Sequence, residues 1–489
     1  MVFEEAIFWR GRGTPMPRVR ELQVTASVIV DLIDAGKFAT AERVLREIRE
    51  ESPLVRVLRA EVEIYFSRLR EAERLLDEVA PEAKDVEVAA RYAMARGELS
   101  YWLYHSEEAE EHFHIALHFY KFLGETFRQA VAFYNLGRLE RRRARFEEAE
   151  RLLNRSIELN RDRDDPRAEF LRGLVLFNLG AIRLYEGRLE PALEFFEEAA
   201  RILKLSEGQR YYGLVLNSLG GLHLYLGHLH KAVAVLQMAK SIFERLGTFH
   251  DLEYASNNMA LALIQLERYK EAERLLQESL ELAQRIGDMA GASTFLTSFA
   301  EFYIAHGDLE RAYACSRRAS EYAELAANLF EKGRALVQLG RVALLRGRYY
   351  ESERALRQAL EIGQKLTSRE IETPACLYLA ELMLAVQPVK AREWLERADQ
   401  LLAAYPHAWF RAELERIRRK MDEGRIRIEE ERFVVDGTRL PKWYEAKEAL
   451  EIFLIRKALE QSGNNLTRAG ELLGTTRVHI HKKKKQYGL

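Results

Sequence analysis

The residues with the clearest chemical pattern lie near the end of the chain, where Arg477 is followed by two histidines and four consecutive lysines. Lysine neutralises phosphates, whereas arginine and histidine can donate hydrogen bonds to base edges in a groove of DNA. The segment therefore combines the two kinds of contact that a nucleic acid offers. We expect base contacts from Arg477, Val478, His479 and His481, and phosphate contacts from Lys482, Lys483 and Lys485.

A short helix and a turn are predicted to precede this basic segment. Residues 446–461 form an amphipathic helix, because their apolar side chains recur at helical spacing. Residues 462–465 end it, and either Asn464 or Asn465 can cap the next helix. Gly474 then turns the chain without strain. A short helix, a glycine turn and a basic helix make a helix-turn-helix, whose last helix enters the major groove of DNA. Further contacts are expected from the residues beside the turn, Thr467, Arg468 and Thr476.

This segment resembles the C-terminal DNA-binding domain shared by Fis and the nitrogen-regulator class of bacterial activators. The match has no gaps and reaches Leu489. Thr475 departs from the isoleucine usual in that family, and Lys484 departs from the usual leucine. Ile480, Lys484 and Tyr487 should share the inward face, so Lys484 must direct its ammonium outward along the helix. The matching residues are Asn464, Thr467, Arg468, Ala469, Leu472, Leu473, Gly474, Arg477, Ile480, Lys482, Lys483, Tyr487, Gly488 and Leu489.

Small residues recur through the rest of the chain. From Gly220 to Ala380 the spacing is 40 residues, and a second series follows the first by about twelve. Turn sequences such as Gly187-Arg188-Leu189 lie between the two series. Two antiparallel helices per unit, in close contact at the small residues, explain this pattern, and such pairs must stack to bury their faces. The first series is Gly137, Gly180, Gly220, Ala260, Ala300, Gly340 and Ala380, and the second is Ala149, Ala192, Ala232, Ala272, Ala312, Ser352 and Ala391.

The repeats resemble the tetratricopeptide repeat. The best-fitting units begin at Asn178 and Ser218, and about six extra residues lengthen each unit beyond the family's usual period of about 34. Weaker units near Phe38, Leu69 and Ala109 bring the count to about ten. The resemblance implies an all-α fold, a right-handed superhelical solenoid of antiparallel helix pairs, followed by the small C-terminal helix-turn-helix domain.

A polar residue lies two positions before each small residue from Gly137 to Gly340. In some relatives of this solenoid, amides at this position line the concave groove and hold an extended peptide. An amide donates and accepts at once, and so matches peptide N–H and C=O groups. The alternative is that these amides tie neighbouring helices together. The candidate groove residues are Asn135, Asn178, Asn217, Asn257 and Asn258, with Tyr185 and Tyr225 as apolar walls.

Composition excludes several classes of protein. No stretch approaches the ~18 consecutive apolar residues of a membrane helix, and the acids near the N-terminus do not fit a signal peptide. Cys315 and Cys376 have no pairing or metal spacing, which favours a reducing cytoplasm. Residues 443–489 hold nine Lys or Arg against five Glu, whereas the rest of the chain has a net charge of −5. Positive charge therefore gathers where a nucleic-acid contact is expected.

No catalytic or cofactor-binding constellation is expected. The sequence has no GxxxxGK[ST] phosphate loop, and local spacing assembles no Ser/His/Asp or Cys/His set. Glu110, His114 and His118 share a helical face at a spacing that suits zinc, but a solvated repeat face is the favoured interpretation. We therefore expect no enzyme, no metal site and no cofactor.

Four segments organise the chain. Residues 1–20, with Trp9 among several apolar side chains, either cap the first repeat or dock in a groove. Residues 21–424 form the solenoid, closed by a capping helix that begins at His407. Residues 425–442 form a linker in which alternating isoleucines and the Asp436-Gly437 turn signal predict a small hairpin. Residues 443–489 form the helix-turn-helix domain.

The sequence predicts a cytoplasmic bacterial transcription regulator. Its solenoid binds a protein or peptide in this interpretation, and its C-terminal domain binds DNA as a dimer on a two-fold site. The alternative is a scaffold whose degenerate helix-turn-helix dimerises without binding DNA, and Lys484 favours that alternative. No membrane contact is expected.

Overall fold

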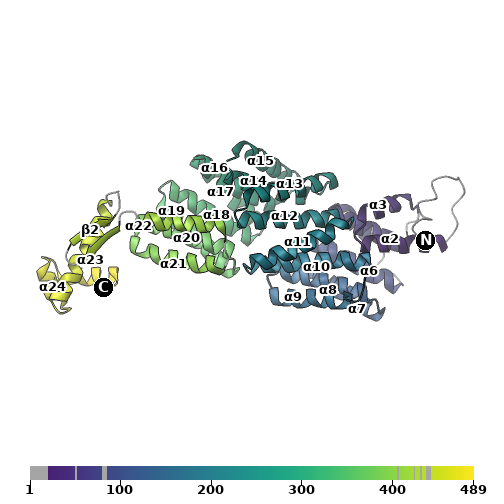
Figure 1. Cartoon of the computed structure of the whole chain (residues 1–489), viewed down its shortest axis with the longest axis horizontal. Helices are drawn as coiled ribbons and strands as arrows, with labels where there is room; N and C mark the ends of the chain where they lie inside the picture. Colours follow the sequence, from purple (N-terminus) through teal and green to yellow (C-terminus); the bar gives the residue numbers. More distant parts are fainter. Residues whose placement is uncertain are drawn as a thin grey trace. The chain divides into compact units, whose positions relative to one another are not determined.

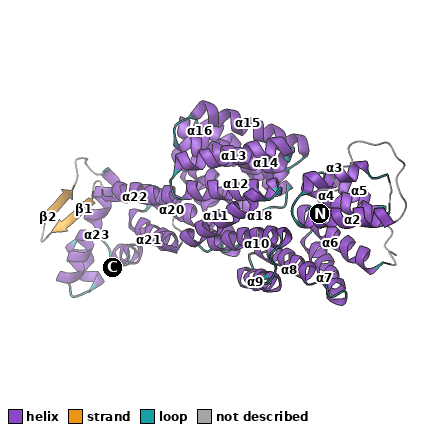
Figure 2. Ribbon diagram, turned by 45° about the vertical axis from the view of Figure 1, so that its right-hand side comes forward, coloured by secondary structure: helices purple, strands orange, loops and turns teal. Residues whose placement is uncertain are grey.

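The computed structural model describes residues 20–49, 52–79, 85–404, 407–422, 425–429, 432–436 and 442–489. The N-terminal segment predicted as a cap, residues 1–20, lies almost wholly outside the described residues. Within the described ranges the structure is helical apart from one pair of short strands (Figure 2). It forms two compact units, one within Met1–Leu222 and Ala232–Ala255 and the other within His223–Lys231 and Ser256–Leu489.

Ten helix pairs follow one another along the described part of the chain (Figure 1). The first helices of the pairs are α2 (Arg20–Asp34), α4 (Pro53–Tyr65), α6 (Val86–Trp102), α8 (Thr126–Arg142), α10 (Pro166–Tyr185), α12 (Gln209–Tyr225), α14 (Phe249–Gln265), α16 (Met289–His306), α18 (Leu329–Leu345) and α20 (Arg369–Val386). The second helices are α3 (Phe38–Glu47), α5 (Leu69–Asp77), α7 (Ser106–Phe122), α9 (Phe146–Asn160), α11 (Leu189–Leu205), α13 (Leu229–Leu246), α15 (Tyr269–Ile286), α17 (Leu309–Leu325), α19 (Tyr349–Lys365) and α21 (Pro388–Ala404).

The two series of small residues mark where the helices of a pair touch. A Cβ added to Gly137 would lie 2.8 Å from Leu153, and one added to Gly340 would lie 2.5 Å from Leu356. Ser352 is fully buried and donates its hydroxyl to the carbonyl of Gly340 at 2.8 Å. Close packing leaves no room for a larger side chain at these crossings. The prediction of close helix pairs from the spacing is therefore confirmed.

Each second helix buries one stripe of side chains, as α19 illustrates. Its buried residues recur at intervals of three and four, so they cover one face of the helix. Its opposite face is charged, with Arg357 paired to Glu353 at 2.8 Å. The stripe can be buried only against neighbouring helices, which explains why the pairs stack. The buried residues of α19 are Ser352, Ala355, Leu356, Ala359, Leu360 and Gly363.

The turns inside all but the last of the described pairs share one backbone conformation. Gly187, Gly227, Gly307 and Gly347 have φ values between +72° and +83°, a region that glycine enters without strain. Other pairs reach the same left-handed region without glycine, at a cost of about 1–2 kcal/mol per residue. Packing of the two helices therefore fixes the turn even where the sequence does not favour it. These non-glycine positions are Ser67, Tyr104, Ala144 and Glu267.

Helix α22 (Ala408–Asp422) covers the last helix pair. It packs against α20 and α21, beside which it lies in Figure 1. Leu414 and Ile417 are fully buried in the same apolar cluster as residues of those two helices. Arg416 also pairs with Glu381 of α20 at 2.6 Å. Helix α22 therefore covers apolar surface of the last helix pair.

The two paired strands expected of the hairpin in the linker are present. Strands β1 (Arg425–Glu429) and β2 (Arg432–Asp436) pair antiparallel, with Ile426 opposite Val435 and Glu429 opposite Arg432. Asp436 ends the second strand and stands opposite Arg425, so the Asp436-Gly437 turn signal does not lie between the two strands.

Three helices complete the chain: α23 (Trp443–Gln461), α24 (Leu466–Leu472) and α25 (Arg477–Tyr487). Residues 443–489 are called the tail below. Among the described residues, no helix is both long enough and apolar enough to span a bilayer.

Candidate functional site

Side-chain caps fix the two short helices of the tail. Asn465 begins α24, because its Oδ1 accepts hydrogen bonds from the backbone N–H groups of Thr467 at 3.1 Å and Arg468 at 3.2 Å. Thr476 begins α25 in the same way, with its Oγ1 accepting from the N–H of His479 at 3.2 Å. A cap of this kind satisfies donors that the first helical turn leaves unpaired. The caps that the sequence indicated are therefore present, with Asn465 and not Asn464 at the first position.

Glycines set the turn between α24 and α25. Gly474 has a φ of +64°, and a Cβ added to Gly470 would lie 2.9 Å from the carbonyl oxygen of Thr475. The N–H of Thr475 donates to the carbonyl of Gly470 at 2.8 Å. The turn therefore folds directly against α24, and the departure from the resembled family at Thr475 does not open it.

The tail has its own small core. Ile480 of α25 is fully buried among residues of α23 and α24 that include Leu459 and Ala469. Tyr487 packs at the edge of this core, and Lys484 is half-buried on the same side of α25. The N–H of Leu489 donates to the carbonyl of Lys484 at 3.0 Å, and the Leu489 side chain joins the core. The inward face predicted from the spacing is therefore confirmed.

The opposite side of α25 is exposed and basic. Val478, Lys482 and Lys485 follow one another at helical spacing on the side opposite Ile480. Val478 keeps 75% of its surface exposed, so it contributes little to the core of the tail. Nine of the ten residues predicted to contact DNA are exposed: Thr467, Arg468, Thr476, Arg477, Val478, His479, His481, Lys482 and Lys485.

Lys483 is the tenth, and it departs from its predicted role. Its Nζ lies 2.8 Å from a carboxylate oxygen of Glu451, to which the Tyr487 hydroxyl also donates at 2.6 Å. The hydrogen bond to Glu451 raises the pKa of Lys483. Burial alone would raise the pKa of Glu451, but the hydrogen bonds from Lys483 and Tyr487 outweigh burial and lower that pKa overall. Lys483 therefore ties α25 to α23, and its charge is already neutralised.

Helix α23 exposes an apolar stripe that sequence analysis did not single out. Trp443, Leu450 and Leu454 lie at helical spacing along one face, with 85%, 43% and 41% of their surfaces exposed. Tyr444 extends the stripe and is 40% exposed. Contiguous exposed apolar residues of this kind mark surfaces that contact other proteins.

The amide series of the solenoid is mostly buried. Asn178 donates from Nδ2 to the carbonyl of Leu174 at 2.9 Å, and its Oδ1 accepts from Nε of Arg141 at 2.8 Å. Both ends of this amide are therefore used to tie α10 to itself and to α8, which is the alternative that the sequence left open. Asn135 and Asn257 are buried, whereas Asn217 and Asn258 are half-buried.

The two tyrosines predicted as groove walls lie at the turns instead. Tyr185 ends α10 and stacks on Phe146 of α9, with ring centroids 5.6 Å apart. Tyr225 ends α12, and its ring meets that of His407 edge-on at 4.8 Å. Each position falls at the end of a first helix, where the side chain reaches the neighbouring turn and not the line of amides.

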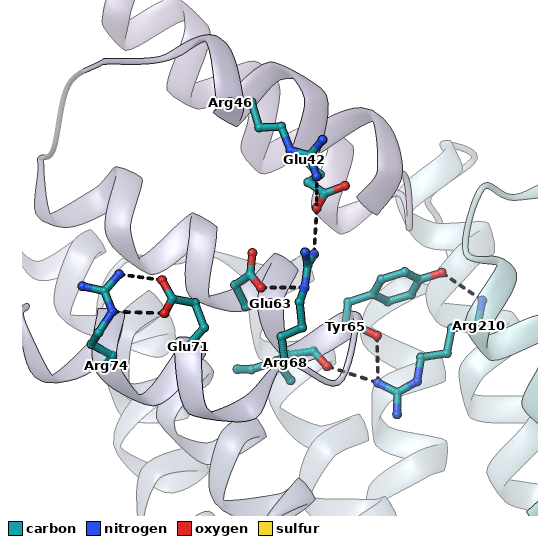
Figure 3. A network of polar contacts seen from close by, with 9 residues as sticks. Glu42, Arg46, Glu63, Tyr65, Arg68, Glu71, Arg74 and Arg210 are labelled. Carbon is teal, nitrogen blue, oxygen red and sulfur yellow. Dashed lines mark hydrogen bonds and ion pairs between the residues drawn. The ribbon is translucent and has the colours of Figure 1, made fainter. Parts of the chain in front are cut away.

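Arg210 joins distant parts of the first unit. Its Nε donates to Asp251 at 2.6 Å. Its Nη1 donates to the carbonyls of Ile64 at 3.1 Å and Tyr65 at 2.8 Å (Figure 3). The Tyr65 hydroxyl accepts the backbone N–H of Arg210 at 2.9 Å, although the two residues are 145 positions apart. Arg210 is only 2% exposed. No local motif could have indicated it, because all its partners are far away in the sequence.

Comparison with known proteins identifies the repeats. Two family models, both described as tetratricopeptide repeat, match residues 254–286 and 333–370 in one case and residues 132–167 in the other. These three segments of the chain therefore match the tetratricopeptide repeat. No curated protein matches the sequence.

Solved structures show partial similarity to the chain. A Rap protein complexed with competence and sporulation factor is 13% identical, with a TM-score of 0.48 over 76% of this chain and 98% of that one. The apo quorum sensor NprR from B. thuringiensis is 16% identical, with a TM-score of 0.48 over 70% and 99%. Aspartyl phosphate phosphatase F from Bacillus subtilis is 13% identical, with a TM-score of 0.47 over 72% and 97%.

Proposed function

We propose that the chain is a cytoplasmic bacterial transcription regulator. Its tail binds DNA as a dimer through a helix-turn-helix made by α24 and α25, and its solenoid binds a protein or peptide partner. The observation that carries the proposal is the exposed basic face of α25, which follows a capped turn while Ile480 anchors the helix from behind. A helix presented in this way fits the major groove.

The exposed side chains of α25 are proposed to make two kinds of contact with DNA. Lys482 and Lys485 reach phosphates, which supply affinity for any sequence. Arg477 and His479, in the first turn of α25, reach base edges, and Val478 supplies an apolar contact for a thymine methyl group. An exposed valine amid basic residues has no folding role, which favours a contact of this kind.

The dimer is proposed to form through the apolar stripe of α23. A second copy of the tail is its natural partner, because a two-fold contact would cover Trp443, Leu450 and Leu454 in both copies at once. Two tails held in this way present two α25 helices to one two-fold site.

The solenoid contributes a surface for a partner. Stacked repeats form extended faces that suit long, chain-like ligands. The half-buried Asn217 and Asn258 remain candidates for contacts with a peptide backbone. Asn178 does not, because it is only 2% exposed and both its Nδ2 and its Oδ1 already make hydrogen bonds within the solenoid.

The second candidate function is a scaffold whose tail dimerises without binding DNA. The same apolar stripe of α23 favours it, and so does the neutralised charge of Lys483. The two candidate functions differ in one respect: in the regulator the basic face of α25 binds DNA, and in the scaffold it does not.

Selection of bound genomic fragments with the purified full chain tests the proposal. We expect enrichment of a two-fold sequence, and Arg477→Ala should weaken binding to it by about 1–3 kcal/mol while changing binding to random DNA little. Enrichment of no sequence, with dimerisation intact, would favour the scaffold.

A further inference from the structure

The first unit contains a cavity of about 110 Å³. Its walls come from the first helices of successive pairs and from Phe38 of α3. A cavity of about 150 Å³ in another protein accepts benzene, and a single water needs only about 10–15 Å³. The space is therefore that of a small organic molecule.

Aromatic rings form one part of the cavity wall. Phe38 and Tyr65 stack with ring centroids 3.9 Å apart, and Tyr211 approaches Tyr65 at 5.8 Å and Phe170 at 5.7 Å. Rings brought together from four different helices offer flat apolar surfaces to a ligand. Arg210, described above, fixes this arrangement through its bonds to Tyr65.

The charged residues around the cavity are paired. Each of three carboxylates in the wall has an arginine partner, so no carboxylate beside the cavity is left without a counter-charge. The Glu61 side chain is 13% exposed, and burial raises its pKa in spite of its arginine partner. A charged ligand would meet only groups that are already paired with one another, and its desolvation would carry a cost. The pairs are Asp34 with Arg128, Glu61 with Arg91, and Glu98 with Arg138.

One polar atom in the wall is unpaired. Asn135 is 1% exposed, and its Nδ2 donates to the sulfur of Met94 at 3.1 Å. Its Oδ1 has no hydrogen-bond partner among the described residues, although the side chain lines the cavity. Buried polar atoms are nearly always bonded, so an acceptor left open beside a cavity points to a donor that is not part of the chain.

We propose that this cavity binds a small neutral molecule with an aromatic or apolar body and one hydroxyl or N–H group that donates to Oδ1 of Asn135. The aromatic wall selects the body, the paired charges reject ions, and Asn135 selects the donor. This site does not depend on the proposed function of the tail, and it would give the solenoid a small-molecule ligand in addition to a peptide partner.

Phenol and toluene provide the test, because they have nearly the same shape and differ in one donor. Titration of the full chain, followed by saturation-transfer NMR, should show phenol binding about 2- to 10-fold more tightly than toluene, which is the effect of one hydrogen bond. Benzoate and benzylamine, which carry charge, should bind more weakly than either. Equal affinities for phenol and toluene, or no binding of both at millimolar concentration, would overturn the proposal.

Two variants test whether Asn135 is the acceptor and whether this cavity is the binding site. Asn135→Leu should keep toluene binding and lose the preference for phenol, whereas the control Asn178→Leu, outside the cavity, should keep that preference. Val131→Phe fills the cavity from α8 and should abolish binding of both molecules. Circular dichroism identifies a variant that fails to fold, and the phenol-to-toluene ratio of the unaltered chain then decides. Unchanged preference in a folded Asn135→Leu variant would reject Asn135 as the acceptor.

Discussion

Lys482 and Lys483 are adjacent lysines for which the structure predicts different roles. Lys482 is exposed, whereas Lys483 is held by Glu451 and Tyr487. Each phosphate contact adds about 0.9 to the slope of log K against log salt. Lys482→Ala should therefore lower the slope by about 0.9. In consequence, the loss of affinity between about 50 and 200 mM salt should be about 3.5-fold smaller than in the unaltered chain.

Lys483→Ala should act on stability instead. The pair with Glu451 is partly buried, with 19% and 31% of the two side chains exposed, so its loss should cost the tail about 1 kcal/mol. The salt slope should remain unchanged, because Lys483 does not reach a phosphate in this structure.

Fluorescence anisotropy with a selected DNA fragment at several salt concentrations measures the slope for both variants. Hydrogen exchange in α23 and α25 measures the stability of the tail. If Lys483→Ala lowers the slope as much as Lys482→Ala does, the pair with Glu451 opens on DNA and the assignment of Lys483 is refuted. An unchanged slope for Lys482→Ala would show that the exposed face of α25 does not contact the DNA phosphates.

Two further predictions concern the solenoid. Arg210→Met leaves Asp251 as a buried, unpaired charge and should destabilise the first unit by about 3–5 kcal/mol. Hydrogen exchange in α4 should therefore become faster. Exchange rates equal to those of the unaltered chain would refute the role of Arg210. Burial lowers the pKa of His407 to about 4, so the unfolded chain binds the extra proton first. Stability should therefore fall as the pH drops from about 6.5 through about 4, and denaturant titration of His407→Phe should show a smaller fall, whereas an equal fall would contradict this.

The repeat architecture could be predicted from the sequence because its signals are local. Gly137 and Ala149 are twelve positions apart and meet across one turn, so their spacing alone indicates the contact. The caps at Asn465 and Thr476 act on residues two or three positions away. Such features depend on helical geometry and on little else.

The contacts that the sequence missed join residues far apart. Glu451 lies 32 positions from Lys483, and Asp251 lies 41 positions from Arg210. A charged residue has many candidates for a partner at such separations, and only the fold selects among them. The role of Asn178 was missed for a related reason, because its position on the helix does not reveal that its Oδ1 accepts a hydrogen bond from Arg141.

Removal of the tail tests the central claim most directly. The full chain and a chain ending before Trp443 should be compared on one selected fragment and on a scrambled fragment, at near-physiological salt. The account predicts that the full chain prefers the selected fragment and that the shortened chain binds neither, while keeping its helical circular dichroism. Binding of the selected fragment by the shortened chain, or an equal affinity of the full chain for both fragments, would contradict it.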